Sequence, residues 1–65
     1  MNLVDGILAE CNRNRDLASA YREVGPVGQF AASMIEAEIS EAEASLGSGD
    51  VVRMLAAYAA LRENE

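Results

Sequence analysis

The chain has 65 residues and a net charge of −6, from eleven Asp and Glu against five Arg, with no Lys or His and one Cys. This length allows a single domain over residues 1–65, and so small a domain buries only about 60% of its unfolded surface. The acidic balance argues against nucleic-acid and membrane partners. A single Cys excludes an intrachain disulfide. Because there is also no His, the chain cannot assemble a zinc site, and we expect no cofactor and no metal.

No targeting segment or membrane span is recognisable. Asp5 and Gly6 interrupt the N-terminal region where a signal peptide would need an unbroken apolar run. The longest apolar run, Met54–Leu61, is far shorter than the ~20 residues that cross a bilayer. We therefore expect a cytoplasmic protein.

The first predicted helix covers residues 3–24. Asn2 is a favourable N-cap, and the carboxylate of Asp5 complements the dipole at the helix N-terminus. Mostly apolar residues then recur at intervals of three and four, which is the spacing of a coiled-coil seam. The members of this stripe are Val4, Ile7, Cys11, Asn14, Ala18 and Tyr21.

Gly25 and Pro26 separate the first helix from a second, predicted over residues 26–46. Glycine suits the end of one helix and proline the first position of the next. One side of the second helix is apolar throughout, whereas its second side changes character along the chain. That second side is formed first by Val27, Phe30 and Met34, and then by Glu38, Glu41 and Ser45.

The third predicted helix covers residues 49–62 and is apolar on almost every side. Gly47 suits a left-handed end for the second helix, Ser48 is the expected cap of the third, and Asp50 complements its dipole. Small residues at Ala56 and Ala60 form a face with no obvious cover within the chain. Because small residues permit close helix approach, this face is a candidate contact for a second copy or another partner.

The fold class is therefore all-α, a bundle of three antiparallel helices over about 3–24, 26–46 and 49–62. The short connections favour antiparallel neighbours. The apolar excess in so small a chain predicts that self-association completes the bundle. The register of the two turns predicts three ion pairs, namely Arg15 with Glu36, Arg13 with Glu38 and Arg53 with Glu43.

No residue pattern indicates catalysis. The only carboxylate cluster is a candidate acidic face, and without histidine it is typical of a solvated helix surface rather than a metal site. A weak divalent-cation contact needs only carboxylates and stays an alternative. Cys11 lies on an apolar stripe and is interpreted as a small buried hydrophobe. The acidic face comprises Glu36, Glu38, Glu41 and Glu43.

The candidate interface combines the apolar excess with one polar position. Asn14 either pairs with a polar group across an interface, where it would fix register or oligomeric state, or lies half exposed at the edge of a drifting stripe. Tyr21 and Tyr58 are expected at the edge of the core with wet hydroxyl groups. The candidate interface residues are Asn14, Tyr21, Phe30, Met34, Met54, Ala56, Tyr58 and Ala60.

Three stretches resemble short uncharacterised helical proteins encoded by bacteriophages and prophages. They are the opening residues 1–15, the break at Gly25-Pro26, and the turn at residues 48–54. The likeness would cover most of the chain, although it rests on helix caps and stripes. It implies an accessory protein of a mobile element and assigns no functional residue.

Two functional hypotheses follow. The first is a non-enzymatic protein–protein interaction module that self-associates and docks on a host or phage protein. The second is an acidic inhibitor or decoy, which would offer the helix 26–46 glutamates to a basic surface of a host nucleic-acid-binding protein. An enzyme is disfavoured because a short helical chain without histidine offers neither a base nor a pocketed nucleophile.

Overall fold

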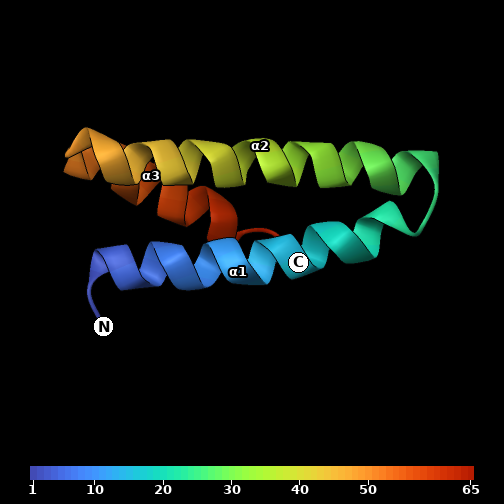
Figure 1. The fold of residues 1–65 in the computed structure, drawn as a ribbon, viewed down its shortest axis with the longest axis horizontal. Helices are drawn as coiled ribbons and strands as arrows, with labels where there is room; N and C mark the ends of the chain where they lie inside the picture. The colour runs from blue at the N-terminus through green and yellow to red at the C-terminus, as the bar shows by residue number, and fades with distance from the viewer.

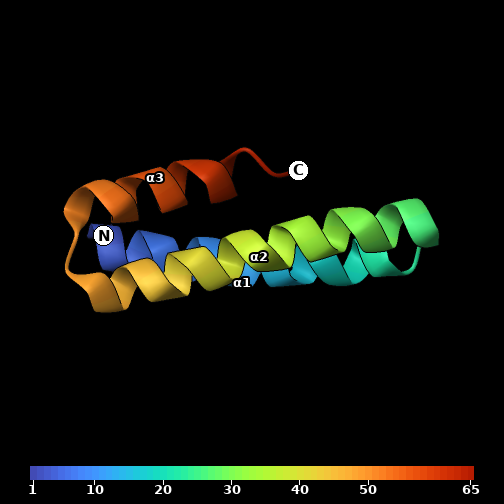
Figure 2. The same cartoon turned by 90° about the horizontal axis from the view of Figure 1, so that it is seen from above.

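The computed structural model describes all 65 residues, as three α-helices and no strand. The helices are α1 (Leu3–Arg22), α2 (Pro26–Ser48) and α3 (Val51–Arg62). α1 and α2 form a long antiparallel hairpin, and α3 returns along one side of it (Figures 1 and 2). The predicted all-α bundle of three antiparallel helices is confirmed.

The first connection is two residues longer than the sequence pattern predicted, because α1 ends earlier. Asn2 caps α1 as expected, because its side-chain oxygen accepts a hydrogen bond from the Asp5 backbone N–H at 2.9 Å. The helix nevertheless ends at Arg22 rather than at residue 24. The N–H of Val24 donates to the carbonyl of Tyr21, three residues back, so the last turn is wound in the 3₁₀ manner. Gly25 then turns the chain at φ +107°.

The second connection lies two residues later than predicted. Gly47 remains inside α2, and Gly49 adopts the left-handed conformation at φ +71°. The N-cap of α3 is Asp50, whose carboxylate accepts from the Arg53 N–H at 3.2 Å. The Ser48 hydroxyl donates to the Ser45 carbonyl at 2.7 Å and accepts from the Asp50 N–H at 3.0 Å. Ser48 is therefore the last residue of α2 and not the N-cap of α3.

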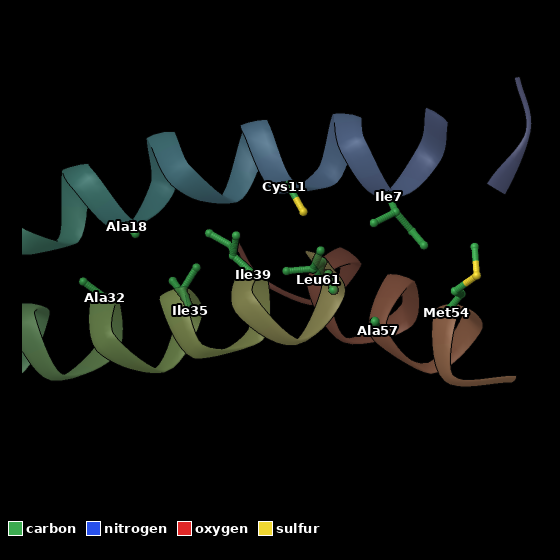
Figure 3. Packing of buried hydrophobic residues seen from close by; sticks show 10 residues of the cluster. Ile7, Cys11, Ala18, Ala32, Ile35, Ile39, Met54, Ala57 and Leu61 are labelled. Carbon is green, nitrogen blue, oxygen red and sulfur yellow. The ribbon is translucent and has the colours of Figure 1, made fainter. Parts of the chain in front are cut away.

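The core is a line of small and medium-sized apolar side chains where the three helices meet (Figure 3). The predicted α1 stripe is confirmed from Ile7 to Ala18, whereas Val4 is 44% exposed. α2 and α3 contribute the other side chains, and Leu61 is fully buried. The ten members are Ile7, Cys11, Ala18, Ala32, Ile35, Ile39, Ala42, Met54, Ala57 and Leu61.

Two glycines mark where helices approach most closely. A Cβ atom on Gly28 would lie 2.0 Å from the Tyr21 carbonyl oxygen and 2.8 Å from the Val24 Cβ, so α2 begins directly against the end of α1. A Cβ atom on Gly6 would lie 3.1 Å from the Tyr58 ring. α1 is thus held close to α2 near the first turn and close to α3 near its own start.

The length of α3 decides which part of the hairpin is covered. α3 has 12 residues, about 18 Å at 1.5 Å per residue, whereas the molecule is 37 Å long. It lies over the half of the hairpin that contains the start of α1 and the end of α2 (Figure 2). The other half, around the first turn, carries no third helix.

Candidate interaction surface

Large apolar side chains are exposed on the half of the hairpin that α3 does not cover. Val24, two residues after the end of α1, is 73% exposed, and Val27, Phe30 and Met34 on α2 are 84%, 68% and 57% exposed. These four residues belong to the part of the hairpin that α3 does not cover, and they are together called the uncovered half below. Single exposed hydrophobic side chains are ordinary, but a contiguous group of this kind on a small domain indicates an interaction site.

The same side of α2 is polar where α3 lies beside it. Glu38 and Glu41 follow Met34 at intervals of four and three residues, so the three share one side of the helix. Glu41 pairs with Arg53 of α3, and Glu38 accepts from Asn64 at 2.8 Å. The predicted change from an apolar to an acidic second side is confirmed. Its apolar part faces solvent, and its acidic part binds α3.

A shallow groove runs between α2 and α3 next to this side. It has a volume of about 320 Å³, and four alanines supply its apolar lining. Glu38, Glu41 and Arg53 form its rim. Ala56 and Ala60, which the sequence indicated as a face without cover, lie in this groove. This hollow is called the alanine groove below, and the four alanines that line it are Ala37, Ala56, Ala57 and Ala60.

The predicted interface residues divide into two groups. Phe30, Met34 and Ala56 are exposed, and Tyr21, Tyr58 and Ala60 are half-buried, as an interface candidate requires. Asn14 and Met54 are buried inside the bundle, so their assignment to an interface was wrong. The reason is that α3 covers the α1 stripe at Asn14 and directs Met54 into the core.

Asn14 meets polar partners within its own chain. Its side-chain amide donates to the Glu10 carbonyl at 2.8 Å and to the Leu61 carbonyl at 3.2 Å, and its oxygen accepts from the Asn64 amide at 2.9 Å. Neither sequence interpretation, a contact between copies or a half-exposed position, describes this fully buried side chain. Asn14 instead ties α1 to the C-terminal end of α3.

Arg13 strengthens the same attachment. Its guanidinium donates to the carbonyls of Leu61 and Asn64, each at 2.9 Å, and pairs with Glu10 in its own helix. Arg13 and Asn14 of α1 thus bind carbonyl groups at the C-terminal end of α3 and just after it. The predicted pair between Arg13 and Glu38 is therefore wrong, because α3 lies between them in the bundle.

The other predicted ion pairs connect the right elements but not the right residues. Arg15 pairs with Glu43 at 2.6 Å, and Arg22 pairs with Glu36. In both pairs the glutamate lies seven residues closer to the C-terminus of α2 than the position that the register of the turn placed opposite the arginine. Side chains lean toward the N-terminus of their own helix, so partners in an antiparallel pair meet about one turn away on each helix.

The α3 arginine also selects a different glutamate. Arg53 binds Glu41 at 2.7 Å rather than Glu43, because Glu43 points to the α1 side, where Arg15 holds it. The hydrogen bond from Arg53 lowers the pKa of Glu41 below its ordinary value. A lowered folded-state pKa means that the pair stabilises the fold above the ordinary carboxyl pKa and that this contribution is lost as the pH falls.

The four glutamates therefore do not form one acidic face. Glu36 and Glu43 lie on the α1 side of α2, and Glu38 and Glu41 lie on the α3 side. No group of three or more Cys, Asp or Glu is placed to hold a metal ion. Cys11 is buried in the core, and burial raises the pKa of its thiol.

Sequence reasoning left several exposed apolar residues out of the candidate interface. Residue 24 was taken as the end of the first helix and Val27 as part of the second side of the helix 26–46, although both belong to the uncovered half. Val51, Val52 and Leu55 of α3 are also more than half exposed. The available signal was the predicted 12-residue length of the last helix, which is too short to cover a hairpin of helices twice as long.

No helix is both long and apolar enough to cross a membrane. Comparison of the chain with protein-family models, curated proteins and solved structures gave no match.

Proposed function

We propose that the protein is a non-enzymatic interaction module that self-associates through its uncovered half. The observation that carries this proposal is the distribution of polarity along one side of α2. Its charged residues bind α3 and the residue Asn64 that follows it, whereas its large apolar residues Val27, Phe30 and Met34 stay largely exposed to solvent. In water this arrangement is unfavourable for an isolated chain, and covering the apolar part removes the cost.

The chemistry of the side chains supports a role without catalysis. The chain has no histidine to act as a general base near neutral pH. Its one thiol is buried in the core, and the raised pKa keeps it protonated. The arginines at positions 13, 15, 22 and 53 are bound to groups of the same chain.

From the resemblance to phage and prophage proteins we further propose that this module is an accessory protein of a mobile element and acts in the cytoplasm. Such a role allows a host or phage protein as a further partner. Self-association comes first in this proposal, because a 65-residue chain without disulfide or metal gains most from burying additional apolar surface.

Sedimentation equilibrium across the micromolar range tests the proposal. We expect reversible association of the wild-type chain, and we expect Phe30→Glu to weaken it at least about tenfold by placing a charge in the buried contact. Val4→Glu is the matched control, since Val4 is exposed but lies in the first turn of α1, away from the connection between α1 and α2. A wild-type chain that is folded and monomeric throughout this range would refute self-association.

The second hypothesis, an acidic inhibitor or decoy that binds a basic protein surface, has less support than self-association. Three of its four glutamates are bound to arginines of the same chain, and the fourth accepts from Asn64. A basic partner would have to displace these contacts. The four carboxylates also point to two sides of α2, so one flat basic surface would not meet them all.

A further inference from the structure

We propose that two copies of the chain pair through antiparallel α2 helices, with Phe30 of each copy seated in the alanine groove of the other. This inference rests on the proposed self-association and specifies its geometry. It follows from the shape, charge and area of one strip of surface, defined by Phe30, Met34 and Ala37 with the neighbouring alanines of α3.

The strip contains both a protrusion and a matching hollow. Phe30 and Ala37 are seven residues apart, two turns along one side of α2, with Met34 between them. Phe30 is 68% exposed and projects from the uncovered half. Ala37 opens into the alanine groove of about 320 Å³. An aromatic ring and a hollow lined by methyl groups are complementary in shape and polarity.

A twofold axis brings each protrusion to the other copy's hollow. When two α2 helices run antiparallel with Met34 near the axis, Phe30 of one copy lies opposite Ala37 of the other. The twofold symmetry makes the contact reciprocal, so one strip supplies both sides of an isologous interface. The symmetry also closes the assembly at two copies and leaves neither hollow empty.

The charges along α2 suit this arrangement. Residues 26–35 contain no ionisable side chain, so the segment that enters the partner's groove brings no carboxylate to a groove rimmed by Glu38 and Glu41. The N-terminus of α2 has no side-chain cap and no acidic residue in its first turn. The antiparallel register places this positive end of the helix dipole beside Glu41 of the other copy.

The available area matches a weak dimer. With Phe30 opposite Ala37, residues 26–41 of the two α2 helices overlap, over roughly 24 Å, and α2 with α3 beside it is roughly 20 Å wide. The footprint of roughly 500 Å² is close to the low end of specific interfaces, about 600 Å² on each copy. That low-end area is about one-seventh of the 4149 Å² surface of the chain.

Exchange of the paired residues tests the geometry. We expect Phe30→Ala to weaken the dimer at least about tenfold, and Ala37→Phe to weaken it similarly by opposing two rings. The double variant, Phe30→Ala with Ala37→Phe, restores one ring opposite each alanine and should recover most of the affinity. The matched control is Val52→Ala, because Val52 is 77% exposed but lies outside the strip. Circular dichroism verifies that each variant is folded.

Cross-linking tests the twofold axis directly. In a Cys11→Ala background, Met34→Cys should oxidise to a disulfide-linked dimer, whereas Val52→Cys should not. Efficient cross-linking together with recovery in the double variant supports the proposal. If none of the three strip variants changes the dissociation constant of the dimer, this geometry is wrong, although self-association is still supported. A strictly monomeric chain would overturn both and assign the strip to a different protein.

Discussion

Asn14 is the residue whose role differs most from the sequence expectation. It occupies a seam position, where a polar side chain often sets oligomeric state. Its three hydrogen bonds instead end within the chain, on Glu10, Leu61 and Asn64. A helical periodicity identifies the buried side of α1 but does not distinguish burial by α3 from burial by a second copy. The sequence could therefore predict that Asn14 is special but not which group it binds.

We predict that Asn14→Asp destabilises the fold by about 2–3 kcal/mol, because the new carboxylate replaces a donor that faces two carbonyl oxygens. In a domain this small, that loss lowers the Tm by roughly 10–20 °C. Burial beside carbonyls would raise the pKa of the introduced carboxyl, so the penalty is present near pH 7. It should shrink as the pH falls and the carboxyl is protonated.

Asn14→Leu is the control for loss of the amide alone. The Leu61 carbonyl keeps its bond from Arg13, and Asn64 keeps its bond to Glu38, so no buried partner is orphaned. Thermal melting monitored by circular dichroism should therefore show a smaller loss for Asn14→Leu. Equal losses for the two variants, unchanged between pH 7 and acid, would contradict the assigned network.

At the scale of the helices, Gly28 and Gly47 have opposite roles although both lie inside α2. We predict that Gly28→Ala destabilises the fold by about 2 kcal/mol or more, because the added methyl group would overlap the Tyr21 carbonyl and force the helices apart. Nothing lies within 4 Å of the corresponding position at Gly47. Gly47→Ala should therefore stabilise by about 0.5–1 kcal/mol through helix propensity.

Urea unfolding of the two variants measures this difference, with the wild type as reference. The midpoints should move in opposite directions with little change in slope, because neither variant alters the surface exposed on unfolding. A stabilising effect of Gly28→Ala would mean that α1 and α2 do not approach closely at the first turn. A strongly destabilising Gly47→Ala would place the helix end at Gly47, as the sequence pattern suggested.

The helices themselves were predictable because their periodicity and breakers are local signals. The exact ends were not, since Gly47 and Gly49 are equally able to adopt a left-handed conformation, and Ser48 and Asp50 are both good caps. The choice depends on where α3 can pack. The ion pairs failed for a similar reason: long side chains lean along the helix, so Arg15 reaches Glu43 rather than the glutamate opposite its own Cα.

At the scale of the whole molecule, the net charge of −6 opposes self-association. Two such charges across the 19 Å width of the molecule would repel by about 8 kcal/mol in unscreened water. Each α2 dipole beside Glu41 contributes only about 0.3–1 kcal/mol of attraction. The repulsion therefore decides how association responds to salt, because a Debye length of about 8 Å at physiological ionic strength removes most of it.

We predict that the dimer strengthens as sodium chloride is raised from about 20 to 150 mM, since screening removes the repulsion and leaves the apolar contact. Sedimentation equilibrium at matched chain concentrations measures the change. The double variant Asp5→Asn with Asp16→Asn lowers the net charge to −4 at exposed positions of α1 that line neither the strip nor a hollow beside it, so its association should depend less on salt. The acidic-decoy hypothesis predicts the opposite salt dependence of binding, because the same screening weakens the attraction between its carboxylates and a basic partner. Association that declines with salt would therefore contradict the apolar dimer and favour an electrostatic contact.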